Sequence, residues 1–503
     1  MATPCSPADL AGALTESLRD HAEQVAVEDG VESLTYRALS ERAEAVVDRL
    51  AVLSRHSHRR HQVLVSARNC ADHVATVIGT ILAGDVPFLV DPAFRADEVR
   101  RIVDTCGIDV LARDTGTATG PLRLSLTPVD GQGPVVLDST RLCRFTSGST
   151  RAPACIEFSG TAVLAAARAW LAGGALNPGE RILCFAGLYN GLAFNTSLIP
   201  GLLSGATLWL PRAAPSAGYV DRHLRRCVPH VLVGFPALYS GLARREQRVG
   251  GLDELRVALS SATRLDPAVA STVAERHGIH IADYYGIAET GPLTVNDTPW
   301  VPGQQGRPLD GVEIRAGTEQ PEQIVVRSPS MGTRYLNHPG AFEQRLTAEG
   351  CYRTGDEGVL RDGRLVLRGR ASKDLDIGGK KVSRAEVESV LSAHPAVRDA
   401  HVLGLTVRTG ERVVAALVVA DGAARGRASN GDLARAVRAH CSERLAAFKT
   451  PTVIAVVPEI PRRSTGKVLG PEASRLAAAG LPVSPPPPVP TARPAPTDAL
   501  EAW

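Results

Sequence analysis

The sequence predicts an α/β protein: a large N-terminal domain of mixed, mainly parallel sheets covered by helices, with a β-rich subdomain, and a small α+β domain at the C-terminus. Three observations predict this fold class. Short apolar runs alternate with longer segments of helical period from about residue 33 to 281, the texture becomes glycine-punctuated and β-rich beyond Asp297, and a second alternating block begins near Arg384. Strands that alternate with helices indicate βαβ units and a parallel sheet covered on both faces.

The βαβ rhythm is regular in the large domain. An apolar run precedes a helical stretch, and a strand then returns, which is the order that a parallel sheet requires. The expected strands lie at 61–65, 86–90, 181–185, 206–210 and 230–233, and the expected helices at 71–82, 192–203 and 236–244.

The remaining elements belong to the β-rich subdomain and to a separate C-terminal block. Strands of the subdomain are expected at 312–315, 323–327, 358–361 and 364–367. The C-terminal block combines helices at 384–393 and 431–445 with strands at 400–405, 412–419 and 453–457. Its size of about 100 residues is one at which domains commonly fold. We therefore divide the chain into an N-terminal domain at 1–370, a C-terminal domain at 371–475, which the family resemblance given below implies to be a mobile lid, and a tail at 476–503, whose proline-rich composition predicts disorder.

Length and composition limit the class of protein. The chain has 503 residues, more than one core of roughly 250–300 residues organises, so two or three domains are expected. Because 56 basic residues face 53 acidic ones, the charge gives no reason to expect a nucleic acid or a membrane as partner. Nine cysteines are scattered singly and no apolar run approaches roughly 18 residues, so we expect reduced thiols and a cytoplasmic protein.

The most informative motif is a small-residue loop made of Thr146, Ser147, Gly148, Ser149 and Thr150. Small residues let backbone N–H groups approach closely, hydroxyls add donors, and successive amides form a concavity suited to phosphate oxygens. The loop is not a Walker A motif, because the Gly-Lys-Ser/Thr ending is missing. By itself the cluster also fits a solvated turn.

Later motifs supply groups that suit a nucleotide. The run Tyr-Gly-Ile-Ala-Glu-Thr at 285–290 follows the last strand expected in the large domain, where open α/β sheets place ligands. An aromatic ring, a close backbone and a carboxylate suit a purine and a phosphate-bound Mg²⁺. Next come a Thr-Gly-Asp motif ending at Asp356 and the pair Gly369-Arg370, and a Ser-Thr-Gly-Lys motif places Lys467 near the end of the folded chain.

Taken in this order, the motifs resemble those of the adenylate-forming superfamily of acyl-CoA synthetases, peptide-synthetase adenylation domains and luciferases. The resemblance spans about Leu34 to Leu469 and is carried by the order of the motifs more than by any one of them. It also includes the segments at 203–207, 306–309 and 378–382, the last followed by Glu-Val-Glu at 386–388.

The resemblance implies a role for each matching residue. The loop from Thr146 to Thr150 would hold the β- and γ-phosphates of ATP, Tyr285 would stack on adenine beside Gly286, and Glu289 would bind Mg²⁺. Two acceptor oxygens suit Asp356 for the ribose hydroxyls. Arg370 would contact ribose or phosphate. Lys467 would be the adenylation lysine, because a carboxylate that attacks the α-phosphate builds negative charge in the transition state.

The chain departs from the family pattern at three places. The phosphate loop usually continues with a lysine where this chain has Ala154, although Arg151 supplies a cation three residues earlier. The threonine usual before the motif glutamate is Ala288, and Thr290 is the candidate to replace its hydroxyl. At the hinge, where Asp or Lys is common, the chain has Ser372 beside a lysine.

Two features of the sequence bear on the substrate acid: one segment lacks an acidic residue, and the motif pattern places five residues at the substrate pocket. Members that activate α-amino acids resemble one another in an aspartate that pairs with the ammonium group. Here no acidic residue lies between Glu180 and Asp221, so a free α-amino acid is disfavoured and an acyl or aryl acid remains. The resemblance places the substrate pocket at five residues, which are Tyr189, Asn190, Phe235, Ser261 and Tyr284.

The function that the resemblance implies is an ATP- and Mg²⁺-dependent carboxylic acid ligase. It would form an acyl-adenylate and pyrophosphate and pass the acyl group to a thiol of CoA or of a carrier-protein phosphopantetheine. The glycine pair at 378–379 would let backbone approach the thiol arm. Two alternatives stay open: an amide synthetase with an amine acceptor, and a degenerate nucleotide-binding member without catalysis.

Overall fold

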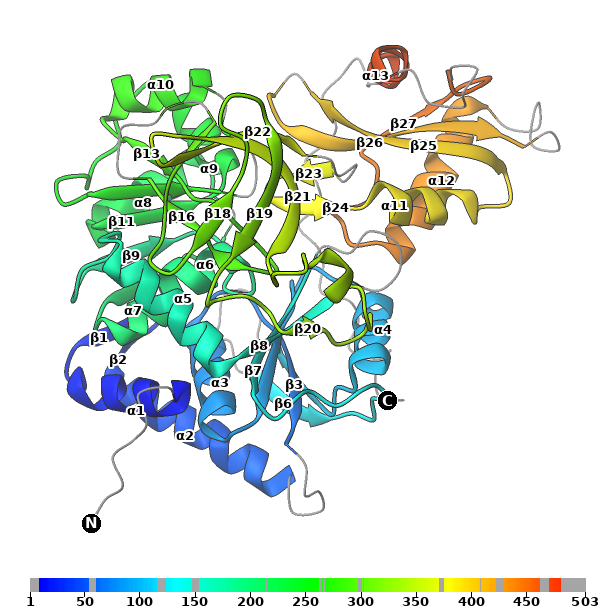
Figure 1. The fold of residues 1–503 in the computed structure, drawn as a ribbon. Helices are drawn as coiled ribbons and strands as arrows, with labels where there is room; N and C mark the ends of the chain where they lie inside the picture. Colours follow the sequence, from blue (N-terminus) through cyan, green and yellow to red (C-terminus); the bar gives the residue numbers. More distant parts are fainter. Residues whose placement is uncertain are drawn as a thin grey trace. The chain divides into compact units, whose positions relative to one another are not determined.

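The computed structural model describes residues 9–53, 60–114, 124–146, 153–213, 215–261, 265, 267–296, 301, 303–370, 375–407, 409–421, 429–461 and 470–480. The chain divides into two compact units, one formed mainly by residues up to Lys381 and the other mainly by residues from Val382 onward. The ribbon in Figure 1 shows the helices and strands of each.

The first unit contains a seven-stranded sheet that we call sheet A. Six of its strands are parallel to their neighbours, and only the pair β1–β2 is antiparallel. The strands lie in the order β13 (Ile281–Asp283), β12 (Val257–Ser260), β11 (Val231–Gly234), β9 (Arg181–Cys184), β10 (Thr207–Trp209), β1 (Val25–Glu28) and β2 (Ser33–Thr35).

A second seven-stranded sheet, sheet B, has a parallel centre and antiparallel edges. The four strands β7, β4, β3 and β5 are parallel, while β8, β20 and β6 are antiparallel to their neighbours. The order is β20 (Arg334–Tyr335), β8 (Cys155–Ser159), β7 (Thr140–Phe145), β4 (Val86–Leu89), β3 (Gln62–Ser66), β5 (Val110–Asp114) and β6 (Leu124–Pro128).

One layer of helices packs between the two sheets. A single core contains residues of sheet A, of sheet B and of the helices between them. The helix α3 shows why this layer is buried: ten of its residues are inaccessible, because it is apolar nearly all round. The layer comprises α1 (Leu10–Asp20), α2 (Tyr36–Leu53), α3 (Ala71–Leu82), α5 (Gly160–Ala172) and the helical run of α6 (Gly191–Ala193), the π-helical turn η2 (Phe194–Leu198) and α7 (Ile199–Leu203).

The outer faces of both sheets are covered as well. The helices α8 (Ala217–Cys227), α9 (Pro236–Ala243) and α10 (Pro267–His277) pack on sheet A around a second core, and α4 (Ala96–Cys106) contributes to a core on sheet B. The predicted fold class, with mainly parallel sheets covered by helices, is confirmed.

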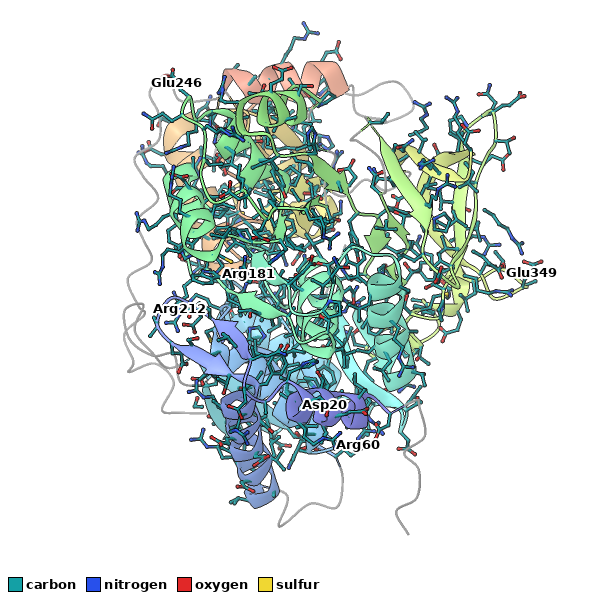
Figure 2. The ribbon with its side chains drawn as sticks, turned by 90° about the vertical axis from the view of Figure 1, so that its left-hand side faces the viewer. Asp20, Arg60, Arg181, Arg212, Glu246 and Glu349 are labelled. Carbon is teal, nitrogen blue, oxygen red and sulfur yellow. The ribbon has the colours of Figure 1, made fainter. Side chains whose placement is uncertain are left out.

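A buried ion pair joins sheet A to the helix layer. Arg212, in the segment after β10, donates from Nη2 to Asp29 at 2.7 Å, and Asp29 also accepts the N–H of Ala71 at the start of α3. Burial alone raises the pKa of Asp29, but the hydrogen bonds from Arg212 and from backbone N–H groups outweigh it and hold this pKa below its usual value. Figure 2 shows Arg212 beside the first strands of the chain.

The β-rich part of the first unit is a six-stranded antiparallel sheet, sheet C, with its own apolar core. The predicted strand at 358–361 begins earlier, so the Thr-Gly-Asp motif lies inside β21 and not in a loop before it. The order is β16 (Thr294–Val295), β17 (Gln304–Pro308), β22 (Arg364–Arg370), β21 (Tyr352–Arg361), β19 (Glu322–Arg327) and β18 (Glu313–Arg315). Short pieces flank it: β14 (Gly286–Ile287), β15 (Gly291–Pro292), η3 (Glu343–Arg345), and the pair β23 (Leu375–Ile377) and β24 (Lys380–Val382).

The second unit is a three-stranded sheet with helices. Its strands β25 (Val397–Thr406) and β26 (Arg412–Ala420) are antiparallel, and β27 (Val453–Val456) is parallel to β26. Helices α11 (Arg384–Ser392) and α12 (Asn430–Arg444) form where predicted. A further helix, α13 (Gly470–Ala479), packs on the sheet, so residues 476–479, which the sequence assigned to the tail, are helical and include the buried Ala477. Residues 481–503 of the tail lie outside the described residues.

Two bulk expectations can be compared with the structure. Eight cysteines of the described residues are free thiols, and all eight are buried. Within the described ranges, no helix combines the length and the apolar character needed to cross a membrane.

Candidate active site

The predicted site residues follow the carboxyl ends of neighbouring strands in sheet A. The strands β13, β12, β11 and β9 are adjacent and parallel, so their carboxyl ends lie at one edge. Open α/β sheets bind ligands beyond this edge. The residues that follow these four strands include Tyr284, Tyr285, Ser261, Phe235, Tyr189 and Asn190.

The two residues predicted to hold the nucleoside contact each other. The Tyr285 hydroxyl donates to Oδ2 of Asp356 at 2.9 Å, and both side chains are buried. Asp356 in β21 is also paired in register with Arg370 in β22. The structure thus brings together an aromatic ring, a carboxylate and the backbone of Arg370, which the sequence separates by up to 85 positions; the Arg370 side chain is outside the described atoms.

Gly286 explains why the motif needs a glycine after the tyrosine. It lies in β14, which pairs with β15 in a tight hairpin. A Cβ at this position would stand 2.4 Å from the carbonyl oxygen of Gly291, a backbone atom that cannot move away cheaply. The close backbone predicted beside Tyr285 is therefore a property of this hairpin.

The predicted metal ligand is held by a chain of hydroxyl groups. The Tyr335 hydroxyl donates to Oε1 of Glu289 at 2.7 Å and lies 3.0 Å from the Tyr352 hydroxyl. Burial, with the charge of Glu289 next, raises the pKa of Tyr335, so this phenol stays a donor. Thr290 is fully buried, and its hydroxyl donates to the carbonyl of Gly291 at 3.5 Å. This contact gives no support to the suggestion that Thr290 replaces the hydroxyl missing at Ala288.

The predicted acid pocket has a buried polar centre. Tyr284 forms a hydrogen bond with Asn195, and its ring lies edge-on to Trp170 with centroids 5.6 Å apart. Burial raises the pKa of Tyr284 to about 12. Ser261 donates to the backbone carbonyl of Tyr284 at 3.0 Å, so it positions the segment that carries this tyrosine.

The other predicted pocket residues have structural partners too. Asn190 caps the helical run that follows it, because its Oδ1 accepts the N–H of Leu192 at 2.9 Å. Burial, followed by the nearby charge of Asp91 and a hydrogen bond with it, raises the pKa of Tyr189. Phe235 is the N-cap residue of α9. A Cβ on Gly379 would lie 2.7 Å from the Phe235 ring. The second glycine of the segment predicted to contact the thiol arm therefore packs against a predicted pocket residue.

Several predicted residues lie outside the described part of the chain. These are Ser147, Gly148, Ser149, Thr150 and Lys467. Thr146 is described: it follows β7, and its N–H donates to the Ala154 carbonyl at 2.8 Å across the base of the loop. The roles of the loop and of the lysine stay predictions.

Sequence reasoning missed three residues that the structure places at the site: Tyr335, Asn195 and Arg144. Tyr335 and Asn195 carry no motif signal, because their role depends on chain segments that meet only in the fold. Arg144 did offer a signal. It is a charged residue beside Leu142 and Cys143 in β7 and is 4% exposed, and buried arginines are uncommon unless paired.

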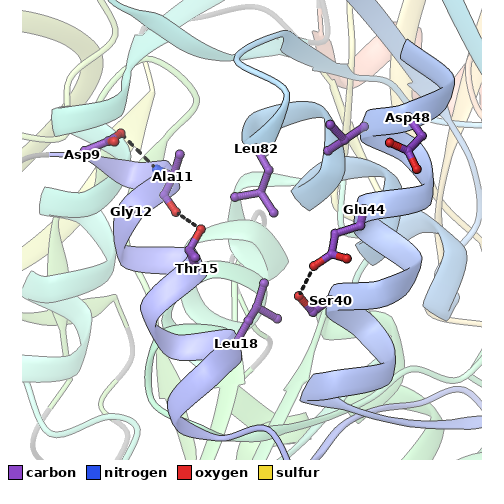
Figure 3. A pocket seen from close by; sticks show the side chains of 10 residues that line it. Asp9, Ala11, Gly12, Thr15, Leu18, Ser40, Glu44, Asp48 and Leu82 are labelled. Carbon is purple, nitrogen blue, oxygen red and sulfur yellow. Dashed lines mark hydrogen bonds between the residues drawn. The ribbon is translucent and has the colours of Figure 1, made fainter. Parts of the chain in front are cut away.

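A separate pocket lies between α1 and α2, with a volume of 540 Å³ (Figure 3). No predicted site residue lines it. Three of its polar side chains already have partners: Ser40 donates to Glu44 at 3.3 Å, and Thr15 donates to the Ala11 carbonyl at 2.9 Å. These groups are satisfied without a ligand, so the chemistry points to the strand ends of sheet A rather than to this pocket.

The fold and the site together define a nucleotide-binding α/β protein with a separate C-terminal unit. Comparison with known families agrees. The family described as AMP-binding enzyme matches residues 14–336, and the AMP-binding enzyme C-terminal domain matches residues 386–467. The chain belongs to the AMP-binding enzymes, the adenylate-forming superfamily.

Curated relatives are CoA ligases by name. The chain is 33% identical to the mitochondrial malonate–CoA ligase of Mus musculus over half of this chain and 45% of that protein. It is 27% identical to a 4-chlorobenzoate–CoA ligase of Arthrobacter sp. over 86% of this chain and 88% of that protein. It is 28% identical to the 3-hydroxybenzoate–CoA ligase of Aromatoleum sp. (strain CIB) over 89% and 92%. The match thus spans less than half the length of the malonate–CoA ligase.

Solved structures share the fold across both units. A double mutant of the o-succinylbenzoate CoA synthetase of Bacillus subtilis aligns with a TM-score of 0.77 at 21% identity, over 92% of this chain and 97% of that one. The amide bond synthetase McbA of Marinactinospora thermotolerans aligns with a TM-score of 0.78 at 20% identity, over 92% and 99%. At these identities the likeness shows the fold alone.

Proposed function

We propose that this protein is an AMP-forming acid–thiol ligase: it joins a carboxylic acid to AMP from ATP, releases pyrophosphate and passes the acyl group to a thiol, that of CoA or of a carrier-protein phosphopantetheine. The observation that carries the proposal is the contact of Tyr285 with Asp356 beyond the strand ends of sheet A. The names of the relatives, all CoA ligases, support the thiol over an amine. An amide synthetase shares the fold, so the amine acceptor remains the second candidate.

The described residues fit the nucleotide. Asp356 offers a carboxylate with two acceptor oxygens for ribose hydroxyls, and its hydrogen bond from Tyr285 fixes the orientation of the carboxylate. Tyr285 keeps its ring beside the close backbone of Gly286, a suitable surface for a purine. This arrangement binds and orients the nucleoside. The phosphates are the part that we assign to the loop that begins at Thr146.

Glu289 fits Mg²⁺ by the chemistry of its oxygens. Mg²⁺ prefers one or two carboxylates together with substrate phosphates and keeps several waters. Tyr335 donates to Oε1 of Glu289 and orients the carboxylate that would hold the ion. The bound ion would neutralise phosphate charge as pyrophosphate leaves.

Lys467 would stabilise the charge that develops when the acid attacks the α-phosphate. We expect Lys467→Ala to lower the rate of acid-dependent ATP/pyrophosphate exchange by about 10²–10³-fold, as loss of one donor to a transition-state anion does. ATP binding should change far less, because the effect belongs to the transition state. Exchange is measured over a panel of fatty, aryl and amino acids.

The matched control is Arg463→Ala, which removes a cation from the same segment and should leave exchange unchanged. Exchange by Lys467→Ala within a few-fold of the natural protein would contradict the mechanism. Mass analysis of products made with CoA, with a holo carrier protein or with an amine then identifies the acceptor. ATP binding without pyrophosphate formation from any acid would instead indicate a non-catalytic member.

A further inference from the structure

Arg144 is the buried one of two arginines in β7. It lies in β7, two residues before Thr146, and is 4% exposed. Its guanidinium stands over two aromatic rings: Cζ is 4.6 Å from the centroid of Phe158 in β8 and 5.4 Å from that of Phe194 in η2. Cation–π contact of this kind stabilises a desolvated arginine only in part.

The guanidinium forms no ion pair among the described residues, although the charge of Glu289 acts on it from farther away and raises its pKa. Its Nε and Nη1 are buried and make no hydrogen bond there. Arg212 is the instructive contrast, because its guanidinium meets the carboxylate of Asp29 at 2.7 Å. Desolvation lowers the pKa of Arg144 to about 10, so the group is still a cation at neutral pH. A buried charge without its counter-ion is costly, and proteins keep one where a ligand supplies the opposite charge.

The surroundings of Arg144 are those of the acid pocket. A Cβ placed on Gly191 would lie 3.0 Å from Nη1 of Arg144 and 3.9 Å from Nδ2 of Asn195, so two donor groups converge beside a residue that has no side chain. Asn195 in turn bonds Tyr284. The π-helical turn η2 brings Phe194 and Asn195 to this place, and such turns are frequent at functional sites.

A nucleotide phosphate is the rival counter-ion, since β7 leads into the phosphate loop. The neighbours argue against it. Two aromatic rings and the pair Asn195–Tyr284 offer few donors, whereas a polyphosphate needs many donors and water. A small organic anion suits this environment better, because one cation and one or two neutral donors match one carboxylate.

We infer that Arg144 is a specificity-determining residue that binds a second carboxylate on the substrate, so that the acid activated by this protein is a dicarboxylate. The inference rests on the proposed ligase function and narrows it. One carboxylate of the substrate reacts with ATP, and the other meets Arg144 and Asn195. An acid of equal length without the second carboxylate leaves the cation unpaired and is bound less well.

The test compares acids matched in carbon number: malonate with propionate, succinate with butyrate, and glutarate with pentanoate. Pyrophosphate exchange gives kcat/KM for each. The natural protein should have a higher kcat/KM for one dicarboxylate than for the monocarboxylate of equal carbon number. Arg144→Gln should lower kcat/KM for that dicarboxylate by about 100-fold or more, the usual cost of removing one member of a buried charge pair. The value for the monocarboxylate and the KM for ATP should move less than about threefold. Arg144→Lys should restore part of the preference.

The matched control is Arg141→Gln, because Arg141 lies in the same strand and bonds only the backbone carbonyls of Asp138 and Thr140 among the described residues. It should leave the preference intact. Thermal unfolding supplies a readout independent of turnover: the preferred dicarboxylate should raise Tm of the natural protein and not that of Arg144→Met, a variant that keeps the fold by replacing an unpaired charge with an apolar chain.

Each failure has its own signature. Equal use of the two acids in every pair, unchanged in Arg144→Gln, overturns the inference and leaves the ligase function standing. An increase in the KM for ATP with every acid assigns Arg144 to the nucleotide and also overturns it. Exchange with none of these acids or of the wider panel overturns the ligase function itself; a dicarboxylate-dependent Tm that Arg144→Met abolishes would still support the anion site.

Discussion

A buried histidine makes the stability of the first unit depend on pH. His73 lies in α3 and is fully buried; its ring bonds the Arg68 carbonyl at 3.2 Å through Nδ1, and Nε2 is buried without a partner among the described residues. Burial lowers the pKa of His73 from 6.5 to about 4. The folded protein therefore keeps the ring neutral at pH values where the unfolded chain takes up a proton.

The expected result is a loss of stability on acidification. The neutral ring costs nothing above pH 6.5, but between pH 6.5 and 4 the unfolded state binds a proton that the folded state does not, so the free energy of unfolding falls by about 3 kcal/mol from this group. Urea unfolding followed by tryptophan fluorescence measures it. In His73→Asn this part of the pH dependence should disappear, whereas the exposed His280→Asn should keep it. Equal slopes for both variants would contradict the assignment.

At the scale of single residues, motif chemistry predicted some groups of the site and not others. Tyr285 and Asp356 were predicted from motifs, and the structure adds that they contact each other. Arg144, Asn195 and Tyr335 were not, because packing between segments that are distant in sequence brings them beside the predicted residues. Arg144 was visible in the sequence, but the sequence alone does not show whether its side chain is buried or contacts an anion.

Among the elements, one glycine of sheet C shows how a family motif can be structural. Gly306 in β17 has a φ of +86°, and a Cβ there would lie 2.0 Å from the carbonyl oxygen of Val295. Both the backbone conformation and the space therefore require glycine. The glycine of the motif at 306–309 is thus required by the path of the strand pair β16–β17.

Gly306→Ala should destabilise the first unit by more than about 1–3 kcal/mol, the range for a side chain forced into a strained backbone conformation, with the clash added. Chemical denaturation measures the change. The control is Gly218→Ala in α8, where φ is not positive and nothing lies within 4 Å of the new Cβ; this exposed helical site should gain up to about 1 kcal/mol. Similar effects at both glycines would refute the explanation.

Periodicity predicted elements best where one signal dominated. The helix at 71–82 was predicted with the bounds that α3 has, because apolar residues of helical period run through the whole segment. The segment 192–203 is helical as predicted, yet it contains the π turn η2, which no pattern of apolar residues reveals. The strand β21 starts six residues before its predicted start, since the polar residues of its first half gave no alternation.

Across the whole molecule, the two units have separate apolar cores. The second unit buries Leu417 and its neighbours in β25, β26, β27 and α13, and all of these residues come from positions after 402. The alternation of helical and strand patterns that begins near Arg384 predicted this unit. Helix α13 was missed because its sequence adjoins the proline-rich tail. A core assembled from one continuous stretch of chain predicts that the stretch folds by itself.

A fragment of residues 382–480 should therefore fold alone and unfold cooperatively. Its length of about 100 residues corresponds to an unfolding enthalpy of about 60–80 kcal/mol near 60 °C, which calorimetry measures. Leu417→Ala should destabilise the fragment by about 2–5 kcal/mol, because the side chain is fully buried in the sheet. The exposed Glu443→Ala in α12 is the control and should have little effect. A fragment without a cooperative transition, or one indifferent to Leu417→Ala, would mean that the second unit depends on the rest of the chain for its core.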